Sequence, residues 1–117
     1  MSRLNLKSSL TWLLVVFFVF GGLGNIFISN EQAASYIRWG YPGWFHYLTA
    51  ALEISTAGLI STRKFRNLGF ALGGSIMIAA AATTLFHREY IHAAPSITAL
   101  LFTVIAARLN GFERSKF

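Results

Sequence analysis

The stretch Ser8–Ile28, SSLTWLLVVFFVFGGLGNIFI, decides the fold, because it runs without a single charged residue. A helix of roughly 20 apolar residues crosses a bilayer core about 30 Å thick. This stretch has that length and continues past the part that would form the apolar region of a signal peptide. No A-x-A-like cleavage site stands at its end, so we expect a retained membrane span.

Three further segments are apolar enough to cross a membrane. Residues 67–86 carry no charged residue, whereas residues 44–60 carry Glu53 at their centre. The last apolar segment, residues 93–107, is short at 15 residues. It reaches span length if residues 90–92 at one end or Leu109 at the other lie at the interface. The sequence therefore predicts an all-α integral membrane four-helix bundle that forms one domain. Its expected spans are residues 8–28, 44–60, 67–86 and 91–108 of a single membrane domain covering residues 1–117.

The composition excludes several other classes of protein. Hydrophobic residues make up 55% of the chain and charged residues 12%, whereas a soluble domain carries about 25% charged residues. The chain has no cysteine and three scattered histidines, which argues against a disulfide scaffold and against a metal site. The net charge of +6 would suggest nucleic acid for a soluble protein, but basic residues flanking membrane spans explain it better. We expect the lipid bilayer, and no nucleic acid, as a partner.

The basic residues predict the orientation of the chain. With four spans, the N-terminus, the loop between the second and third spans and the C-terminal tail lie on one side. Eight of the ten basic residues fall in these segments, and only Arg38 and Arg88 fall on the other side. Basic loops stay cytoplasmic, so we expect both termini in the cytoplasm. The eight residues are Arg3, Lys7, Arg63, Lys64, Arg66, Arg108, Arg114 and Lys116.

A short interfacial helix is expected over residues 31–39, between the first two spans. Ser29 and Gln32 have the spacing of a capping box, in which a side chain accepts a hydrogen bond from the first turn. Gly40 permits the left-handed backbone that ends a helix, and Pro42 prevents the helix from resuming. Aromatic residues gather around this loop, as they do at membrane interfaces. They are Trp39, Tyr41, Trp44 and Tyr47.

Glu53 is the most informative single residue, because an acidic side chain at the centre of a span costs about 2.5–3.5 kcal/mol on insertion scales. It belongs to a polar stripe on one helix face, and no Lys or Arg lies within a span to pair with it. We therefore expect its carboxyl to be neutral and hydrogen-bonded, or hydrated through a cavity open to the outside. The stripe consists of His46, Thr49, Glu53 and Thr56.

Two roles for Glu53 stay open from the sequence. It joins helices through a hydrogen bond, or it binds a proton, a cation or a quinone-like ligand, as ionisable residues inside membranes often do. The histidines are expected near the outer interface. There each is either a surface residue or, together with Tyr36 and Tyr41, part of the lining of a pocket mouth. The candidate site residues are Glu53, His46, Asn25, Thr49, Tyr41 and His87, and the third histidine is His92.

Small residues predict where the helices touch. Gly69 and Gly73 form a GxxxG pattern on the third span, which lets helix backbones approach closely. The pattern serves either a contact within the chain or a contact between copies, so a homo-oligomer stays open.

Several short motifs together resemble the DoxX-like family of small four-helix membrane proteins. The run Gly40-Tyr41-Pro42 opens the second span, and Glu53 follows it along the same helix. The first span ends in a glycine-bearing segment, and the third carries methionine and small residues followed by threonines and a histidine, as in that family. One departure concerns Asn25, which stands where related proteins often carry a lysine, so an intramembrane Lys–Glu pair is missing here.

The resemblance implies an accessory or small-ligand-binding subunit of the bacterial cytoplasmic (inner) membrane, linked to quinone or redox metabolism. Quinone is the one cofactor it suggests, and a redox or other membrane protein is the partner it suggests. The chain has no Asp, no phosphate-binding loop and no Rossmann motif, so we expect no independent catalytic activity. Two alternatives stay open: a small proton-coupled transporter that uses Glu53, and a purely structural partner of another membrane protein.

Overall fold

The computed structural model describes residues 3–111. Over this range the chain forms helices and turns and no β-strand, which confirms the expected all-α fold. Two of the basic residues counted above, Arg114 and Lys116, lie outside the described residues. The elements are α1 Arg3–Ile26, α2 Asn30–Arg38, α3 Phe45–Ser61, the 3₁₀ helix η1 Arg63–Phe65, α4 Arg66–Phe86 and α5 Tyr90–Leu109.

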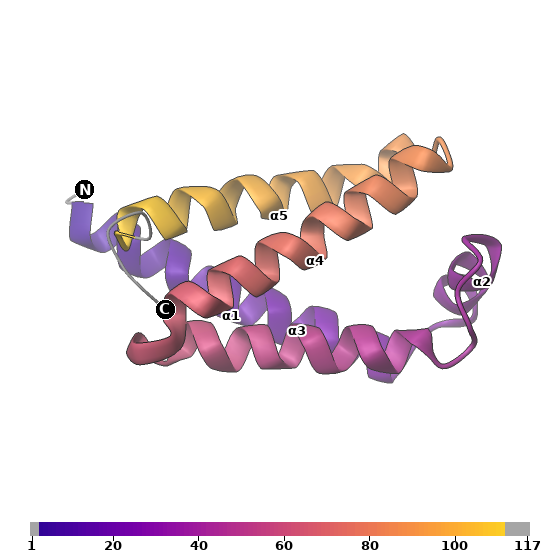
Figure 1. Ribbon diagram of the computed structural model, residues 1–117, viewed down its shortest axis with the longest axis horizontal. Coiled ribbons are helices and arrows are strands. Elements are labelled where there is room, and N and C mark those ends of the chain that lie inside the picture. The colour runs from indigo at the N-terminus through magenta and orange to yellow at the C-terminus, as the bar shows by residue number, and fades with distance from the viewer. Residues whose placement is uncertain (1–2, 112–117) are drawn as a thin grey trace.

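The four long helices lie lengthwise in a bundle, and α2 covers one of its ends (Figure 1). The bundle measures 43 × 26 × 24 Å. Helix α3 packs against both α1 and α4, and α4 packs along α5. We call the end covered by α2 the α2 end. The opposite end, where α1 begins and η1 turns, is the basic end, and its described basic residues are Lys7, Arg63, Lys64, Arg66 and Arg108.

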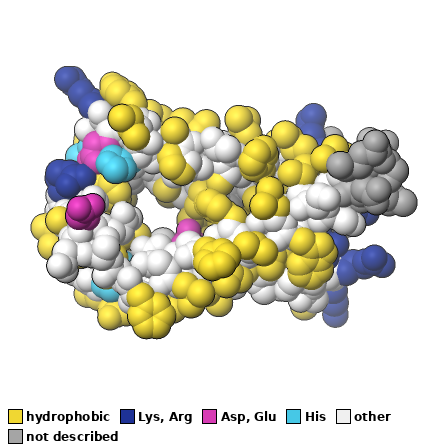
Figure 2. All heavy atoms as spheres, turned by 180° about the vertical axis from the view of Figure 1, so that it is seen from behind, with side chains coloured by type: hydrophobic (Ala, Val, Ile, Leu, Met, Phe, Trp, Pro, Cys, Tyr) yellow, Lys and Arg dark blue, Asp and Glu magenta, His cyan; other side chains and the backbone are white. Residues whose placement is uncertain are grey.

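The surface of the bundle suits a bilayer. Helices α1 and α5, and η1 together with α4, are long and apolar enough to cross a membrane, and α3 has 17 residues. Large apolar side chains cover the outside of the bundle (Figure 2), among them Phe20 at 68% and Ile78 at 57% exposure. A soluble domain rarely leaves so much apolar surface in contiguous patches. The chain is therefore a multi-pass membrane protein.

The GxxxG pattern is used inside the chain. A Cβ atom at Gly69 would lie 2.7 Å from the backbone nitrogen of Ile60, and one at Gly73 would lie 2.8 Å from the ring of Phe18. The side chains of Ile60 and Phe18 are themselves fully buried. Of the two uses left open by the sequence, these two glycines therefore serve the packing of α4 against α3 and α1.

The short helix α2 begins and ends as its sequence predicts, with bounds that differ by one residue from the expected 31–39. The Ser29 side chain accepts a hydrogen bond from the backbone of Gln32 at 3.1 Å. Gly40 has a φ of +89°, a left-handed conformation that a side chain would strain. The chain then turns through Pro42 and enters α3 at Phe45. This turn fixes α2 across the end of the bundle.

Candidate functional site

A cavity of about 580 Å³ lies between the helices near the α2 end. All five α-helices contribute to its wall, because α4 and α5 diverge there from α1 and α3 (Figure 1). Figure 2 shows the bundle hollowed at this place, with an acidic side chain at the edge of the hollow. The volume falls in the range of pockets that hold small molecules, about 300–1,000 Å³.

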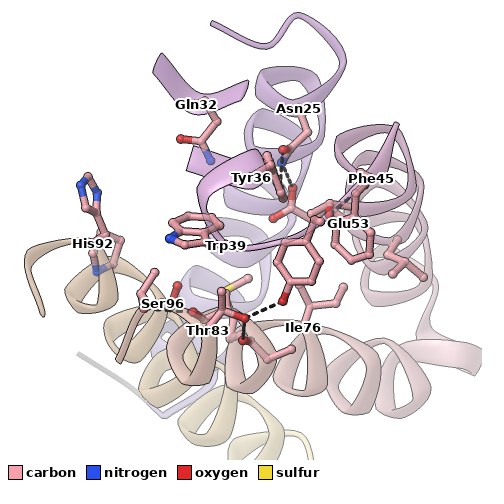
Figure 3. Close-up of a pocket in the computed structure, with 18 of the residues that line it drawn as sticks. Asn25, Gln32, Tyr36, Trp39, Phe45, Glu53, Ile76, Thr83, His92 and Ser96 are labelled. Carbon is pink, nitrogen blue, oxygen red and sulfur yellow. Dashed lines mark hydrogen bonds between the residues drawn. The ribbon is translucent and has the colours of Figure 1, made fainter. Parts of the chain in front are cut away.

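Glu53 lies on the wall of this cavity and is 6% exposed. Its Oε2 accepts a hydrogen bond from Nδ2 of Asn25 at 3.0 Å, as Figure 3 shows. The carboxyl rests against Gly21, where a Cβ atom would lie 2.9 Å from Oε1. Within residues 3–111, Asn25 is the sole hydrogen-bond partner of this carboxyl. One of its two oxygens is therefore available to a ligand in the cavity.

Asn25 joins three elements through four hydrogen bonds. Its Nδ2 also donates to the Gly21 carbonyl at 3.0 Å, and its Oδ1 accepts from the Tyr36 hydroxyl at 2.7 Å. Its backbone carbonyl lies 2.7 Å from Nδ1 of His46, and since a carbonyl only accepts, that nitrogen carries the proton. Burial raises the pKa of Tyr36, so its hydroxyl stays protonated and donates. These hydrogen bonds connect Tyr36 on α2, through Asn25 on α1, to Glu53 on α3.

Aromatic side chains form the part of the wall nearest the α2 end. Tyr36 lies 6.0 Å from Phe45 and 5.7 Å from Trp39, measured between ring centroids. Tyr41 stacks on Phe45 at 4.3 Å with an interplanar angle of 7°. The Tyr41 hydroxyl lies 2.7 Å from Oγ1 of Thr83, which itself donates to a backbone carbonyl of α4. Tyr41 is therefore the donor, and this bond ties the α2–α3 loop to α4.

A second contact, which we call the α2 latch, joins α2 to the loop before α5 through Arg38, Trp39 and Glu89. The Glu89 carboxylate accepts hydrogen bonds from Nη2 of Arg38 and from Nε1 of Trp39, both at 2.7 Å. The hydrogen bond from Arg38, and to a smaller extent the one from Trp39, lowers the pKa of Glu89 to about 2. Because Trp39 also lines the cavity, the latch fixes part of the cavity wall.

The α2 latch is expected to open in acid. The pKa of Glu89 is lowered from 4.5 to about 2, so the latch is fully stabilising above about pH 4.5 and weakens as the pH falls toward 2. The fluorescence of Trp39, measured in a Trp12→Phe/Trp44→Phe background, should be constant from neutral pH to about pH 5 and then change. In the Glu89→Gln variant the change should be absent. A change of equal size in that variant would show that the latch does not hold Trp39.

Four of the six candidate site residues line the cavity, namely Glu53, Asn25, Thr49 and Tyr41. The other two lie behind or beside it. His46 is buried against the backbone of Asn25, and Nδ1 of His87 bonds the Thr83 carbonyl at 2.9 Å. For the three histidines the sequence left open a surface position or the lining of a pocket mouth, and among them only His92 lines the cavity.

The sequence did not reveal several residues of the site. Trp39 was expected as an interfacial anchor, but its indole donates to Glu89, which lies 50 residues further along the chain. Trp44 and Tyr47, by contrast, are 60% and 58% exposed, as interfacial anchors are. Thr83 was also not among the candidate site residues, because the sequence around a threonine in an apolar helix does not indicate its hydrogen-bond partner.

Similarity to known proteins identifies the family. No curated protein matches the chain, and no solved structure matches it. The model of the DoxX-like family matches residues 9–106, a range that includes all five α-helices in whole or in large part. The chain belongs to the DoxX-like family.

Proposed function

We propose that the protein binds a small, largely apolar molecule with a polar head in the cavity beside Glu53, and that this ligand is quinone-like. The observation that carries the proposal is the Glu53 carboxyl, which is buried on the cavity wall with one oxygen unused by the described protein groups. No fully buried side-chain nitrogen or oxygen of the described residues lacks a hydrogen-bond partner, so this second oxygen is accessible from the cavity. A ligand in the cavity can therefore form a hydrogen bond with it.

The chemistry of the wall favours a neutral head group. Among the residues that the structure describes, neither Lys nor Arg lines the cavity, and Glu53 is the one carboxyl that does so. Quinone carbonyls accept hydrogen bonds, and a protonated Glu53 or a cavity hydroxyl would donate them. Aromatic rings such as Trp39 and Phe45 offer flat apolar surfaces to a planar ring. The DoxX-like family resemblance points to the same class of ligand.

The proposal also includes the location and the orientation of the protein in the membrane. We place it in the bacterial cytoplasmic membrane with α3 as a fourth span and with the basic end in the cytoplasm, because basic residues favour that side. The α2 end and the latch then face the outer side. A role as an accessory subunit to a redox protein fits a chain that holds no cysteine and binds rather than converts its ligand.

Glu53→Gln is expected to weaken quinone binding about tenfold, the equivalent of about 1.4 kcal/mol. The amide keeps the shape of the carboxyl but changes which hydrogen bonds it offers. Binding is measured in nanodiscs by quenching of Trp39, in a chain that also carries Trp12→Phe and Trp44→Phe. Glu31→Gln is the matched control, because it removes an acid that is exposed on α2 and should leave binding unchanged. Equal binding by wild type and both variants would contradict the proposal.

A proton-coupled transporter of lipophilic cations is the second candidate. One carboxyl and several aromatic residues line the same cavity, and carboxylates and aromatic faces both attract organic cations. Tetraphenylphosphonium in place of quinone tests this function. Tight binding of the cation that is lost in Glu53→Gln, without quinone binding, would favour the transporter. Binding of neither probe would favour the purely structural role.

A further inference from the structure

The cavity opens through the side of the bundle. Six residues of its wall are exposed: Phe17 on α1, with 36% exposure, Gln32 on α2, Ala79 on α4, and Ile91, His92 and Pro95 on α5. Of these, Phe17 and Pro95 lie away from the helix ends, on the two helices that border the gap between α1 and α5. Helices α1 and α5 meet at the basic end, where Asn110 donates to the Thr11 hydroxyl at 3.1 Å. Toward the α2 end they separate (Figure 1). Figure 2, viewed across the long axis of the bundle, shows a hollow in this part of the molecule.

The side opening lies at the depth of the lipid chains. With a rise of about 1.5 Å per residue, Phe17 lies about 13 Å from the end of α1 at Ile26, and Pro95 lies about 7 Å from the start of α5 at Tyr90. Both depths fall inside a hydrocarbon core about 30 Å thick. Side chains that border an opening at this depth meet lipid tails rather than water.

Hydrogen-bonded bridges cross the α2 end of the bundle, where Gln32 and His92 of the wall are exposed. The α2 latch spans from α2 to Glu89, and the Tyr41–Thr83 hydrogen bond spans from the α2–α3 loop to α4. Figure 3 shows Trp39 among the residues that line the cavity, with Gln32 and His92 to one side of it. A molecule that comes from water at the α2 end must pass these bridges, whereas one dissolved in the bilayer reaches the side opening directly.

We propose that the ligand enters from the bilayer through the gap between α1 and α5, and that it is a membrane-dissolved molecule with an apolar tail. Its head lies beside Glu53 and Asn25, and its tail leaves past Phe17 and Pro95 into the lipid. This inference rests on the proposed ligand-binding function and adds to it the entry route and the class of ligand.

Quinones that share a head but differ in the tail test the entry route. Ubiquinone-10 dissolved in the nanodisc bilayer should quench Trp39 to the same extent as tailless ubiquinone-0, and Glu53→Gln should weaken both. A naphthoquinone sulfonate confined to water should not compete with either. If ubiquinone-0 binds but ubiquinone-10 does not, the side entry is wrong while the proposed function stands. If no quinone binds, the proposed function itself fails.

Two matched variants of α1 test the gap directly. Phe17→Ala removes a ring at the opening and should speed both association and dissociation of ubiquinone-10 several-fold, while the equilibrium affinity changes little. Phe20→Ala removes the ring of another phenylalanine of α1, which is more exposed, at 68%, and does not line the cavity. This variant should leave both rates unchanged. Equal rates in Phe17→Ala, Phe20→Ala and wild type would overturn the side entry. Thermal unfolding confirms that both variants are folded.

Discussion

Replacing Asn25 by leucine is expected to lower the free energy of unfolding by about 2–4 kcal/mol and to weaken ligand binding at the same time. The substitution removes the hydrogen-bond partners of both Glu53 and Tyr36. Each buried polar group left without a partner costs about 1–3 kcal/mol. Glu53 is 6% exposed and Tyr36 8% exposed, so each loses a hydrogen bond in a largely buried position.

The same substitution combined with Glu53→Leu separates the hydrogen bond from mere packing. Removing both partners of a buried hydrogen bond costs less than leaving one of them unpaired. The Asn25→Leu/Glu53→Leu protein should therefore be more stable than the sum of the single effects predicts, by about 1–3 kcal/mol. Unfolding in mixed micelles with a rising fraction of SDS measures all four proteins. Strict additivity would show that the hydrogen bond between these two residues contributes nothing.

Gly69→Ala is expected to destabilise the bundle by about 1–3 kcal/mol, the usual effect of overpacking. Its Cβ would lie 2.7 Å from the backbone nitrogen of Ile60 and 3.0 Å from Cβ of Leu59. Neither atom belongs to the far end of a flexible side chain, so α3 and α4 must move apart. Because α3 carries Glu53, the shift should also reduce quinone binding.

Gly74→Ala is the matched control for this prediction. It lies on the same helix, and its new Cβ would meet one atom, a Leu100 methyl carbon at 3.9 Å, which is ordinary contact. Alanine is the better helix former by about 1 kcal/mol, so this variant should be as stable as wild type or more so. Thermal unfolding in detergent compares the two. Equal stability of Gly69→Ala and Gly74→Ala would mean that the close α3–α4 contact is not required.

Much of the fold can be predicted from the sequence, because the residues that indicate each helix lie within that helix or within a few positions of its ends. An uncharged apolar stretch such as Ser8–Ile28 indicates a membrane helix wherever its neighbours lie. The same holds for α2, whose cap at Ser29 and end at Gly40 depend on residues a few positions away. Boundaries shift by a few residues, as in α1, which begins at Arg3 and ends at Ile26.

The site follows from the sequence only in part, because periodicity gives the face of a helix but not the partner across it. The spacing of Thr49 and Glu53 places both on one face, and both line the cavity. Asn25 was a candidate, but its bond to Glu53 joins residues 28 positions apart. The pairing of Arg38 with Glu89, 51 positions apart, depends on how the helix ends meet, and no local pattern encodes it.

The central claim is that the cavity beside Glu53 holds the ligand. A quinone that carries a photoreactive azide on its ring tests this most directly, when it is activated in nanodiscs and the labelled residues are mapped by mass spectrometry. We expect labels on cavity residues such as Thr49 and Met77, fewer labels with excess ubiquinone-10, and a loss of labels in Glu53→Gln. Labels confined to outward-facing residues such as Ile78 and Leu101, which are 57% exposed, and unchanged in Glu53→Gln, would contradict the central claim.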